Sequence, residues 1–265
     1  MNFEKFSKEI RRNTLRCLHS QGSGHVGGCL SIVDVLAVLY GKHMDVDPAD
    51  PKKVDRDKLV LSKGHAGPAL YATLALKGFF PMEWLDTLNK LGTRLPSHVN
   101  INLTPGVDMT AGSLVQGLSC ACGLALAMKA QGINKHVYVI TGDGELQEGQ
   151  NWEGAMFAAN KGLNIIVLVD NNKLQIDGAT KDVMNVEDIE AKFAAFGFGT
   201  QRVDGHDHKE LSKAISQAKR RKGPQCIVMD TVKGKGVSFY EQMGAGVHST
   251  NVTDEQYALA LNELK

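Results

Sequence analysis

The sequence has almost no net charge, because 30 Lys and Arg residues face 29 Asp and Glu residues in a chain of 265, which leaves +1. A chain without bulk attraction to nucleic acid or to an acidic membrane surface is expected to bind neither. The uninterrupted run of about 18–20 apolar residues that a membrane span needs is also missing. The N-terminal stretch MNFEKFSKEIRRNTLRCLH is charged throughout and has no apolar signal-peptide core, so the expected location is cytoplasmic.

Cysteine is scarce and irregularly spaced, with five residues in the chain. The odd number argues against a disulfide framework, and Cys120-Ala-Cys122 lacks the two-residue gap of a redox or zinc pair. Reduced, buried thiols are therefore expected. Disorder is not indicated either, since 43% of the residues are hydrophobic and 22% charged. Glycine, with 28 residues, is the type in excess, which predicts places where the backbone turns sharply or approaches something closely.

Apolar strands alternate with helices through the chain. The pattern predicts strands at 58–61, 136–141, 164–170, 201–203 and 225–231, and helices at 3–19, 32–40 with Ser31 as its cap, 68–77, 114–130, 149–161, 193–198 (its last turn) and 209–222. This order is typical of an α/β, doubly wound fold with a mostly parallel sheet and helices on both faces. Because no internal repeat or long linker interrupts it, residues 1–265 are expected to form a single domain.

A glycine-rich stretch near the N-terminus imitates a dinucleotide-binding motif. Gly22, Gly24 and Gly27 match the G-x-G-x-x-G pattern. That motif works only where a strand leads into the turn and a helix follows it, whereas here an amphipathic helix is predicted before the glycines. We therefore reject a dinucleotide site. His25, held between these glycines, is a candidate site residue.

Polar side chains follow two of the predicted strands. HVYVIT runs into Gly142-Asp143-Gly144, and NIIVLVD runs into Asn171-Asn172. Because ligands of α/β proteins bind at the carboxyl ends of parallel strands, Asp143 and Asn172 are expected to meet there. A carboxylate and an amide oxygen suit a hard divalent cation, and the glycines let backbone N–H groups approach an anion. Each pattern alone is an ordinary turn, whereas both together favour a site for a metal and a diphosphate.

From these residues outward, the sequence resembles the transketolase family. GDG followed at this spacing by NN looks like the thiamine diphosphate motif, and the surrounding ITGDGELQEGQNWEGAMFAANKGLNIIVLVDNNKLQIDG looks like transketolase in particular. The resemblance extends to SGHVGG, RDKLVLSKGHAGPALYATLALKG, LPSHVN, TPGVDMTAGSLVQGLSCACGLALA, DGHD and DTVKGKG. It covers only the diphosphate-binding half of an ordinary transketolase, so the chain resembles the N-terminal subunit of a split enzyme.

The resemblance implies a role for individual residues of this chain. It assigns the divalent metal, Mg²⁺ or Ca²⁺ or Mn²⁺, to Asp143, Asn172 and the carbonyl of Leu174. Contacts to the cofactor are implied for Gly144 and Lys233 at the diphosphate, and for His65, Gly112, Ser113 and Leu114 along its length. Glu148 is implied in an acidic network that crosses to the partner. His25, His98 and His248 are implied at the reacting carbons of the sugar, where a group that titrates near neutral pH suits proton transfer.

The resemblance does not place every histidine equally well. The family has Trp-His-Gly where this chain has Val247-His248-Ser249, so the alignment alone does not fix the position of His248. His206 and His208 in DGHDH are interpreted as surface structure rather than as metal ligands.

The resemblance also implies a partner and a reaction. The missing pyrimidine-binding domain, with the glutamate that activates the cofactor, would come from a C-terminal transketolase subunit in an α2β2 heterotetramer, so the chain alone is expected to be inactive. The reaction would move a two-carbon ketol unit from a ketose phosphate to an aldose phosphate; a pentose phosphate, a branched or a sulfonated sugar all fit. Two alternatives are the α subunit of a 2-oxo acid dehydrogenase and a non-catalytic phosphate-binding module.

Overall fold

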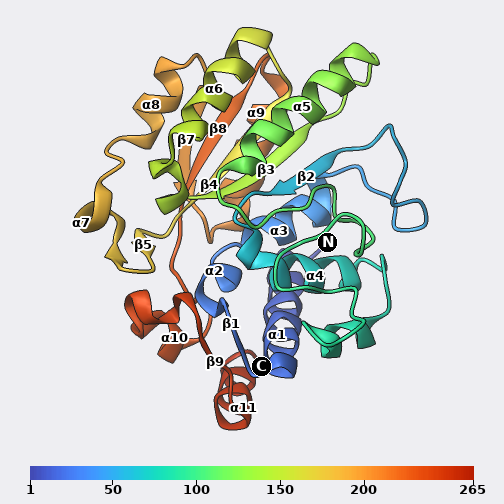
Figure 1. Cartoon of the computed structure of the whole chain (residues 1–265), viewed down its shortest axis with the longest axis vertical. Helices are drawn as coiled ribbons and strands as arrows, with labels where there is room; N and C mark the ends of the chain where they lie inside the picture. The colour runs from blue at the N-terminus through green and yellow to red at the C-terminus, as the bar shows by residue number, and fades with distance from the viewer.

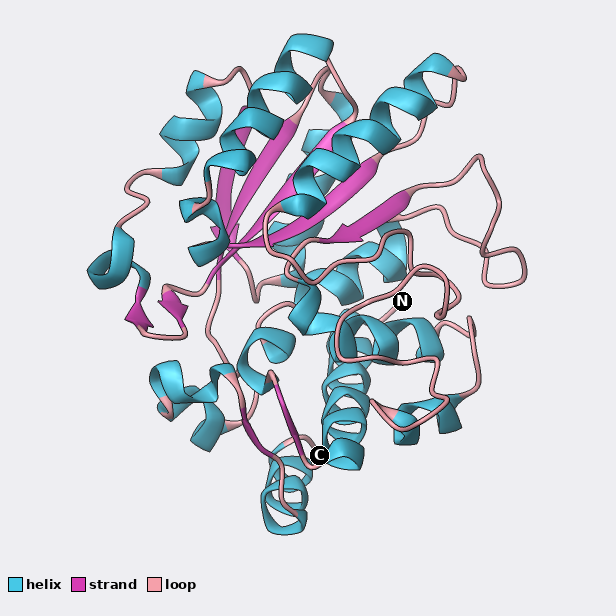
Figure 2. Ribbon diagram, in the orientation of Figure 1, coloured by secondary structure: helices cyan, strands magenta, loops and turns pink.

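A parallel five-stranded sheet forms the centre of the computed structural model, which describes all residues from 1 to 265 (Figures 1 and 2). The strands lie in the order β2-β3-β4-β8-β7, and every neighbouring pair is parallel. Their bounds are β2 Lys58–Leu61, β3 Val137–Gly142, β4 Ile165–Asn171, β8 Gln225–Asp230 and β7 Gly199–Asp204. The predicted doubly wound α/β fold with a mostly parallel sheet is confirmed, and all five predicted strands are present.

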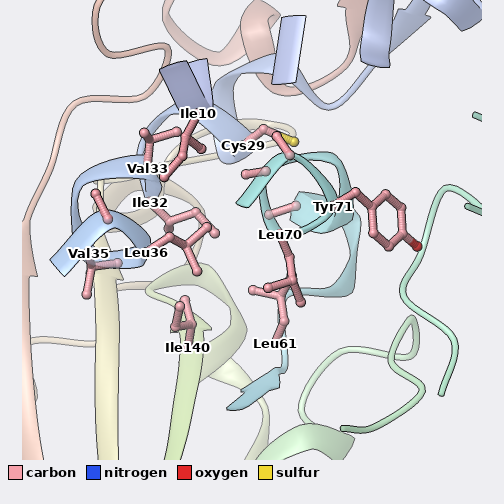
Figure 3. Packing of buried hydrophobic residues seen from close by; sticks show 14 of the residues in the cluster. Ile10, Cys29, Ile32, Val33, Val35, Leu36, Leu61, Leu70, Tyr71 and Ile140 are labelled. Atoms are coloured by element: carbon pink, nitrogen blue, oxygen red, sulfur yellow. The ribbon is translucent and has the colours of Figure 1, made fainter. Parts of the chain in front are cut away.

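The strands divide their side chains between two hydrophobic layers. Along β3, Val137 and Val139 face one layer while Tyr138 and Ile140 face the other. This alternation with a period of two is expected for a pleated strand that is buried on both faces. Figure 3 shows part of the larger layer, where Leu61 and Ile140 point toward side chains of the N-terminal helices.

The helices cover both faces of this sheet (Figure 1). The smaller layer packs against α5 Gln116–Ala130, α6 Gly149–Lys161 and α8 Ile189–Ala195. The larger layer packs against α1 Phe3–Gln21, α2 Val26–Leu30, α3 Val33–Val38, α4 Gly67–Leu76, α9 His208–Arg220 and α11 Asp254–Glu263. Most predicted helix ends lie within about two residues of the observed ones, which is the usual uncertainty of such boundaries.

The N-terminal helices differ from the prediction. The expected helix 32–40 is instead α3 followed by a π-helical turn at Leu39–His43, and Ile32 precedes α3. The prediction of Ser31 as an N-cap is wrong, because its hydroxyl donates to Gly28 O (3.3 Å) and to Asp170 Oδ2 (2.7 Å). The glycine-rich stretch follows a helix, α1, as predicted.

One segment is apolar enough to resemble a membrane span by length and composition. Residues 26–43 have a mean hydropathy of 1.3 over 18 residues, which the sequence analysis did not anticipate. In the fold, 89% of this segment is buried inside the protein, as α2, α3 and the turn after them. Core helices of this kind pass the same test.

Several short elements were not predicted. A hairpin of β5 Leu174–Gln175 and β6 Gly178–Ala179 leads into α7 Thr180–Met184. After β8 the chain forms α10 Ser238–Gln242, a 3₁₀ turn at Gly244–His248, and β9 Thr250–Asn251, which pairs antiparallel with β1 Ser23–Gly24. This pairing brings the chain around His248 back to the N-terminal segment that carries His25.

Candidate active site at the carboxyl ends of the strands

Asp143 and Asn172 meet beside the ends of β3 and β4, as the strand pattern predicts. Gly142 of β3 pairs with Asp170 of β4, so the two strands end at the same level of the sheet. The Asp143 carboxylate accepts the N–H of Lys173 at 2.5 Å and that of Gly144 at 2.8 Å. Asn172 Oδ1 accepts the N–H of Leu174 at 3.1 Å. Both side-chain oxygens are therefore held by the same turn of backbone.

The chemistry of these oxygens fits a divalent cation. Asp143 is buried and has no cationic side chain within salt-bridge distance. Burial and the nearby charge of Asp170 raise the pKa of Asp143 to about 6, a cost that a bound cation would offset. The carbonyl oxygen of Leu174 already faces a cationic group, since Lys233 Nζ donates to it at 3.0 Å. Carboxylate, amide and carbonyl oxygens form the donor set that Mg²⁺ and Ca²⁺ prefer.

A buried ion pair supports this corner of the sheet. Lys63 at the end of β2 and Asp170 at the end of β4 form a salt bridge, with side chains 2% and 0% exposed. Asp170 also accepts hydrogen bonds from Ser31, Thr231 and Asn172. Burial opposes ionisation of Asp170, but Lys63 and these hydroxyl donors outweigh it, so its pKa lies below the ordinary value.

Four histidines from distant parts of the chain come together beside the oxygen ligands, with Lys233 between Leu174 and His248. The ring centroid of His25 lies 5.2 Å from that of His65, 5.8 Å from that of His98 and 5.5 Å from that of His248. The rings of His65 and His248 are 5.3 Å apart. The structure thus places His248, which the alignment left open, in the cluster. The arrangement does not have the geometry of a metal site formed by His, Cys, Asp and Glu.

Gly27 permits the close approach that builds this cluster. A Cβ at this position would lie 2.6 Å from Val247 Cγ1 and 2.7 Å from Lys233 Cγ, closer than real Cβ contacts. The start of α2 can therefore rest directly against the segments that carry Lys233 and His248. Lys233 Nζ in turn lies 2.9 Å from His248 Nδ1.

Burial keeps the clustered histidines neutral. Desolvation is the largest cause that lowers the pKa of His25, of His65 and of His98. Desolvation and the charge of Lys233 together lower the pKa of His248 to about 4. At neutral pH each ring can consequently accept a proton from a hydroxyl group or donate a hydrogen bond to a carbonyl oxygen.

Oxygen ligands and histidines line one cavity of about 360 Å³. Every predicted site residue except Ser113 lines it: His25, His65, His98, Gly112, Leu114, Asp143, Gly144, Glu148, Asn172, Leu174, Lys233 and His248. Ser113 is exposed and lies outside the lining. Lys233 is buried, with its ammonium group in the cavity.

The sequence analysis missed other residues of this cavity. Lys63, Glu145 and the tip of the β5–β6 hairpin also line it. Glu145 accepts the N–H of Val115 at 2.7 Å and that of Gly142 at 3.0 Å, so it ties the Gly112–Val115 loop to the end of β3. A signal was present for the Lys63 salt bridge, because a lysine and an aspartate each end a predicted apolar strand.

The histidine pKa values predict a pH dependence of stability. A group whose pKa is lower in the folded chain than its ordinary 6.5 binds fewer protons there than in the unfolded chain, so its contribution to stability is lost as pH falls. We expect the melting temperature of the chain to drop between pH 7 and 4.5, and His248→Asn to drop less over the same range. Asp143, whose pKa is raised, acts in the opposite direction. Equal slopes for both proteins would contradict this account of His248.

Comparisons with known proteins agree with this geometry. Residues 4–264 match the family described as "Transketolase, thiamine diphosphate binding domain". The 6-deoxy-6-sulfo-D-fructose transketolase subunit SqwG of Clostridium sp. (strain MSTE9) is 51% identical, over 97% of this chain and 94% of that protein. An apulose-4-phosphate transketolase subunit of Actinobacillus succinogenes is 39% identical, over 99% and 95%.

Longer transketolases match over part of their length. The transketolase of Mus musculus is 36% identical over 90% of this chain and 38% of its own. The solved structure of transketolase from Leishmania mexicana matches this chain with a TM-score of 0.92 and 33% sequence identity. The match covers 100% of this chain and 41% of the Leishmania chain. The chain therefore spans about two fifths of these transketolases. By sequence and by fold, the chain belongs to the transketolase family, as its thiamine diphosphate binding domain.

Proposed function

We propose that this chain is the diphosphate-binding subunit of a two-subunit transketolase, which transfers a two-carbon ketol unit from a ketose to an aldose. One observation carries the proposal: the buried Asp143 carboxylate, the Asn172 amide and four histidines share one cavity at the carboxyl ends of the strands. The family match favours this function over a 2-oxo acid dehydrogenase subunit. The retained Asp143, Asn172 and histidines argue against a non-catalytic phosphate-binding module.

The cation site would anchor the cofactor. Asp143, Asn172 and the Leu174 carbonyl would hold Mg²⁺, or Ca²⁺ or Mn²⁺, and the remaining ligands would be diphosphate oxygens. Lys233 and Gly144 line the same cavity, where Lys233 would add a donor and Gly144 would let the diphosphate approach the backbone. Thiamine diphosphate, when bound, supplies an electron sink for the carbanion that the reaction forms.

The histidines would handle the sugar. Their neutral rings can hold hydroxyl groups and move a proton at the oxygen of the bond that is cleaved or formed. We assign that step to His25 and His248, whose rings stand edge to face, and the orientation of donor hydroxyls to His65 and His98. Burial, and after it the charge of Lys233 at 2.9 Å from Nδ1, hold the pKa of His248 at about 4, which keeps that ring neutral.

A partner subunit would complete the site. The rim of the cavity at Gly112, Leu114 and Glu148 is exposed in this chain, and relatives of similar length are named as subunits of transketolases. We propose a C-terminal subunit that covers this rim in an α2β2 heterotetramer, located in the cytoplasm. The names of two relatives, for a sulfonated and a phosphorylated ketose, favour a ketose with an anionic end as the donor.

Glu148 offers a test of the rim. Its carboxylate is exposed, precedes α6, and makes no capping hydrogen bond. We expect Glu148→Gln to change the free energy of unfolding of the chain by no more than about 0.5 kcal/mol, since such surface substitutions cost little. In the complex with the partner, kcat should fall at least about 100-fold, the lower end of what a proton-transfer contact contributes. Glu153→Gln is the control, because Glu153 is an exposed carboxylate on α6 that does not line the cavity, and this variant should keep its kcat. Equal losses of kcat in the two variants would refute the role of Glu148.

Reconstitution tests the function as a whole. The purified chain with Mg²⁺ and thiamine diphosphate should show no ketol transfer, and addition of the co-expressed partner should restore it in a screen of phosphorylated and sulfonated ketoses. Transfer by the chain alone would contradict the two-subunit proposal. Acyl transfer to a lipoyl acceptor would instead support the dehydrogenase alternative, and cofactor binding that ignores Mg²⁺ and Asp143→Ala would support a non-catalytic module.

A further inference from the structure

The segment that carries Lys233 is held from two sides. Residues 231–236, here called the Lys233 segment, follow β8 and include Lys233, which lines the cavity. On the cavity side Thr231 Oγ1 donates to Asp170, and the N–H of Gly234 donates to Gly27 O at 3.1 Å. On the far side the N–H of Val232 donates to His206 Nε2 at 2.8 Å. Arg11 Nε also donates to the carbonyl oxygen of Lys235, at 3.0 Å.

His206 and Arg11, which make the two far-side contacts, both bind one buried carboxylate. Asp34 on α3, with its side chain 4% exposed, accepts from Arg11 Nη1 at 3.0 Å. It also accepts from His206 Nδ1 at 2.8 Å and from His208 Nε2 at 3.0 Å. Burial opposes its ionisation, but these two histidines and Arg11 outweigh burial and lower the pKa of Asp34. Both histidines face inward, so their interpretation as surface structure is wrong.

The contacts of His206 assign the position of its proton. A backbone N–H can only donate, so Nε2, which receives the N–H of Val232, must carry a lone pair. The single ring proton then lies on Nδ1, which donates it to Asp34. His206 is thus a neutral ring of one tautomer that bridges a fixed carboxylate and the backbone beside Lys233. His208 contacts the same carboxylate and not the Lys233 segment.

A glycine brings His206 within reach. The turn between β7 and α9 lies against the end of β8, where the N–H of Gly205 donates to Asp230 O at 2.8 Å. A Cβ at Gly205 would lie 2.4 Å from Thr231 Cγ2. Any other residue would therefore push the turn, and the ring of His206 with it, away from the Lys233 segment.

We propose that His206 is a positioning residue for the diphosphate end of the active site. It couples Asp34 to the backbone of the Lys233 segment and thereby fixes the backbone from which the Lys233 side chain reaches into the cavity. The proposal rests on the proposed function in so far as Lys233 serves a diphosphate. The arrangement of the segment itself does not depend on that function.

Isosteric variants separate the two contacts of the ring. In His206→Asn the amide nitrogen takes the place of Nδ1 and keeps Asp34, but the acceptor for Val232 is lost. In His206→Gln the amide oxygen reaches the place of Nε2 and keeps that acceptor. His208→Asn is the matched control, because it alters Asp34 alone. The measurements are hydrogen exchange of residues 231–236 by mass spectrometry and the Kd for inorganic pyrophosphate with Mg²⁺, on the whole chain.

We expect exchange of the Lys233 segment to become about tenfold faster in His206→Asn, the effect of one lost hydrogen bond. The Kd for pyrophosphate should rise by a similar factor in His206→Asn, while His208→Asn should stay within about twofold of the wild type in both measurements. His206→Gln should fall between them, because it keeps the acceptor for Val232 but loses the contact with Asp34 that fixes this acceptor. Equal effects of His206→Asn and His208→Asn, or unchanged exchange in His206→Asn, would overturn the proposal. So would ¹⁵N NMR of the wild-type chain with the proton of His206 on Nε2, a test that needs no variant to fold. If Lys233→Met leaves pyrophosphate binding unchanged, the proposed function fails, while hydrogen exchange still decides the role of His206.

Discussion

Asp170→Ala is expected to lower the free energy of unfolding by about 3–5 kcal/mol, the cost of leaving a buried charge without its partner. The change removes the counter-ion of Lys63, whose side chain is only 2% exposed, together with acceptors for Ser31 and Thr231. These groups join β2, α2 and the Lys233 segment to β4. Chemical denaturation at pH 7 measures the effect.

Asp230→Asn is the matched control for this prediction. Asp230 ends β8 directly beside the end of β4. Its salt bridge with Arg202 is exposed, since the side chains of Asp230 and Arg202 are 40% and 42% exposed. Exposed pairs contribute about 0–1 kcal/mol, so the control should unfold nearly as the wild type does. A loss of less than about 1 kcal/mol in Asp170→Ala would show that Lys63 finds water or another partner, contrary to the buried pair described above.

Asp143→Asn is expected to abolish metal-dependent cofactor binding while the fold persists. The amide keeps the shape and an oxygen for the N–H of Lys173, but its NH2 group replaces the acceptor for the N–H of Gly144, a loss of about 1 kcal/mol. Removal of a charge that burial disfavours offsets part of this loss, so the metal-free chain should stay folded. The only carboxylate among the proposed cation ligands is lost, however. We expect affinity for Mg²⁺ with thiamine diphosphate to fall at least about 100-fold in the complex, because even supporting residues of metal sites contribute 10–100-fold.

Asp177→Asn separates a ligand from a nearby charge. Asp177 lies on the β5–β6 hairpin, lines the same cavity and is exposed. Its loss should change the affinity by about threefold at most, as expected of an exposed charge that solvent screens. Calorimetric titration of both variants and the wild type makes the comparison. Similar affinities of Asp143→Asn and the wild type would remove the cation site from the proposed function.

The parallel sheet and the meeting of Asp143 with Asn172 could be predicted from sequence because both depend on short-range pattern. An apolar strand followed directly by a polar turn fixes which residues lie at the carboxyl edge of the sheet. Parallel neighbours then bring those edges together without further information. The strand pattern does not place Lys233 or His65 in the cavity, because nothing local marks them. Only the family resemblance predicts their position.

Ser31 shows why the remainder could not be predicted. A serine before an apolar helix is a local signal for an N-cap, but the hydroxyl donates to Asp170, 139 residues away. The Lys63–Asp170 salt bridge joins residues 107 apart, and Asp34 collects Arg11, His206 and His208 from three elements. Such pairings are decided by tertiary packing, and a single sequence states only that each charged residue needs some partner.

Anomalous scattering from Mn²⁺ in crystals of the chain and its partner, grown with thiamine diphosphate, tests the central claim most directly. The account predicts one strong peak between the Asp143 carboxylate and Asn172 Oδ1, with the Leu174 carbonyl turned to the ion and the Lys233 ammonium group displaced from it. A manganese ion bound elsewhere, with Lys233 still on the Leu174 carbonyl, would contradict it.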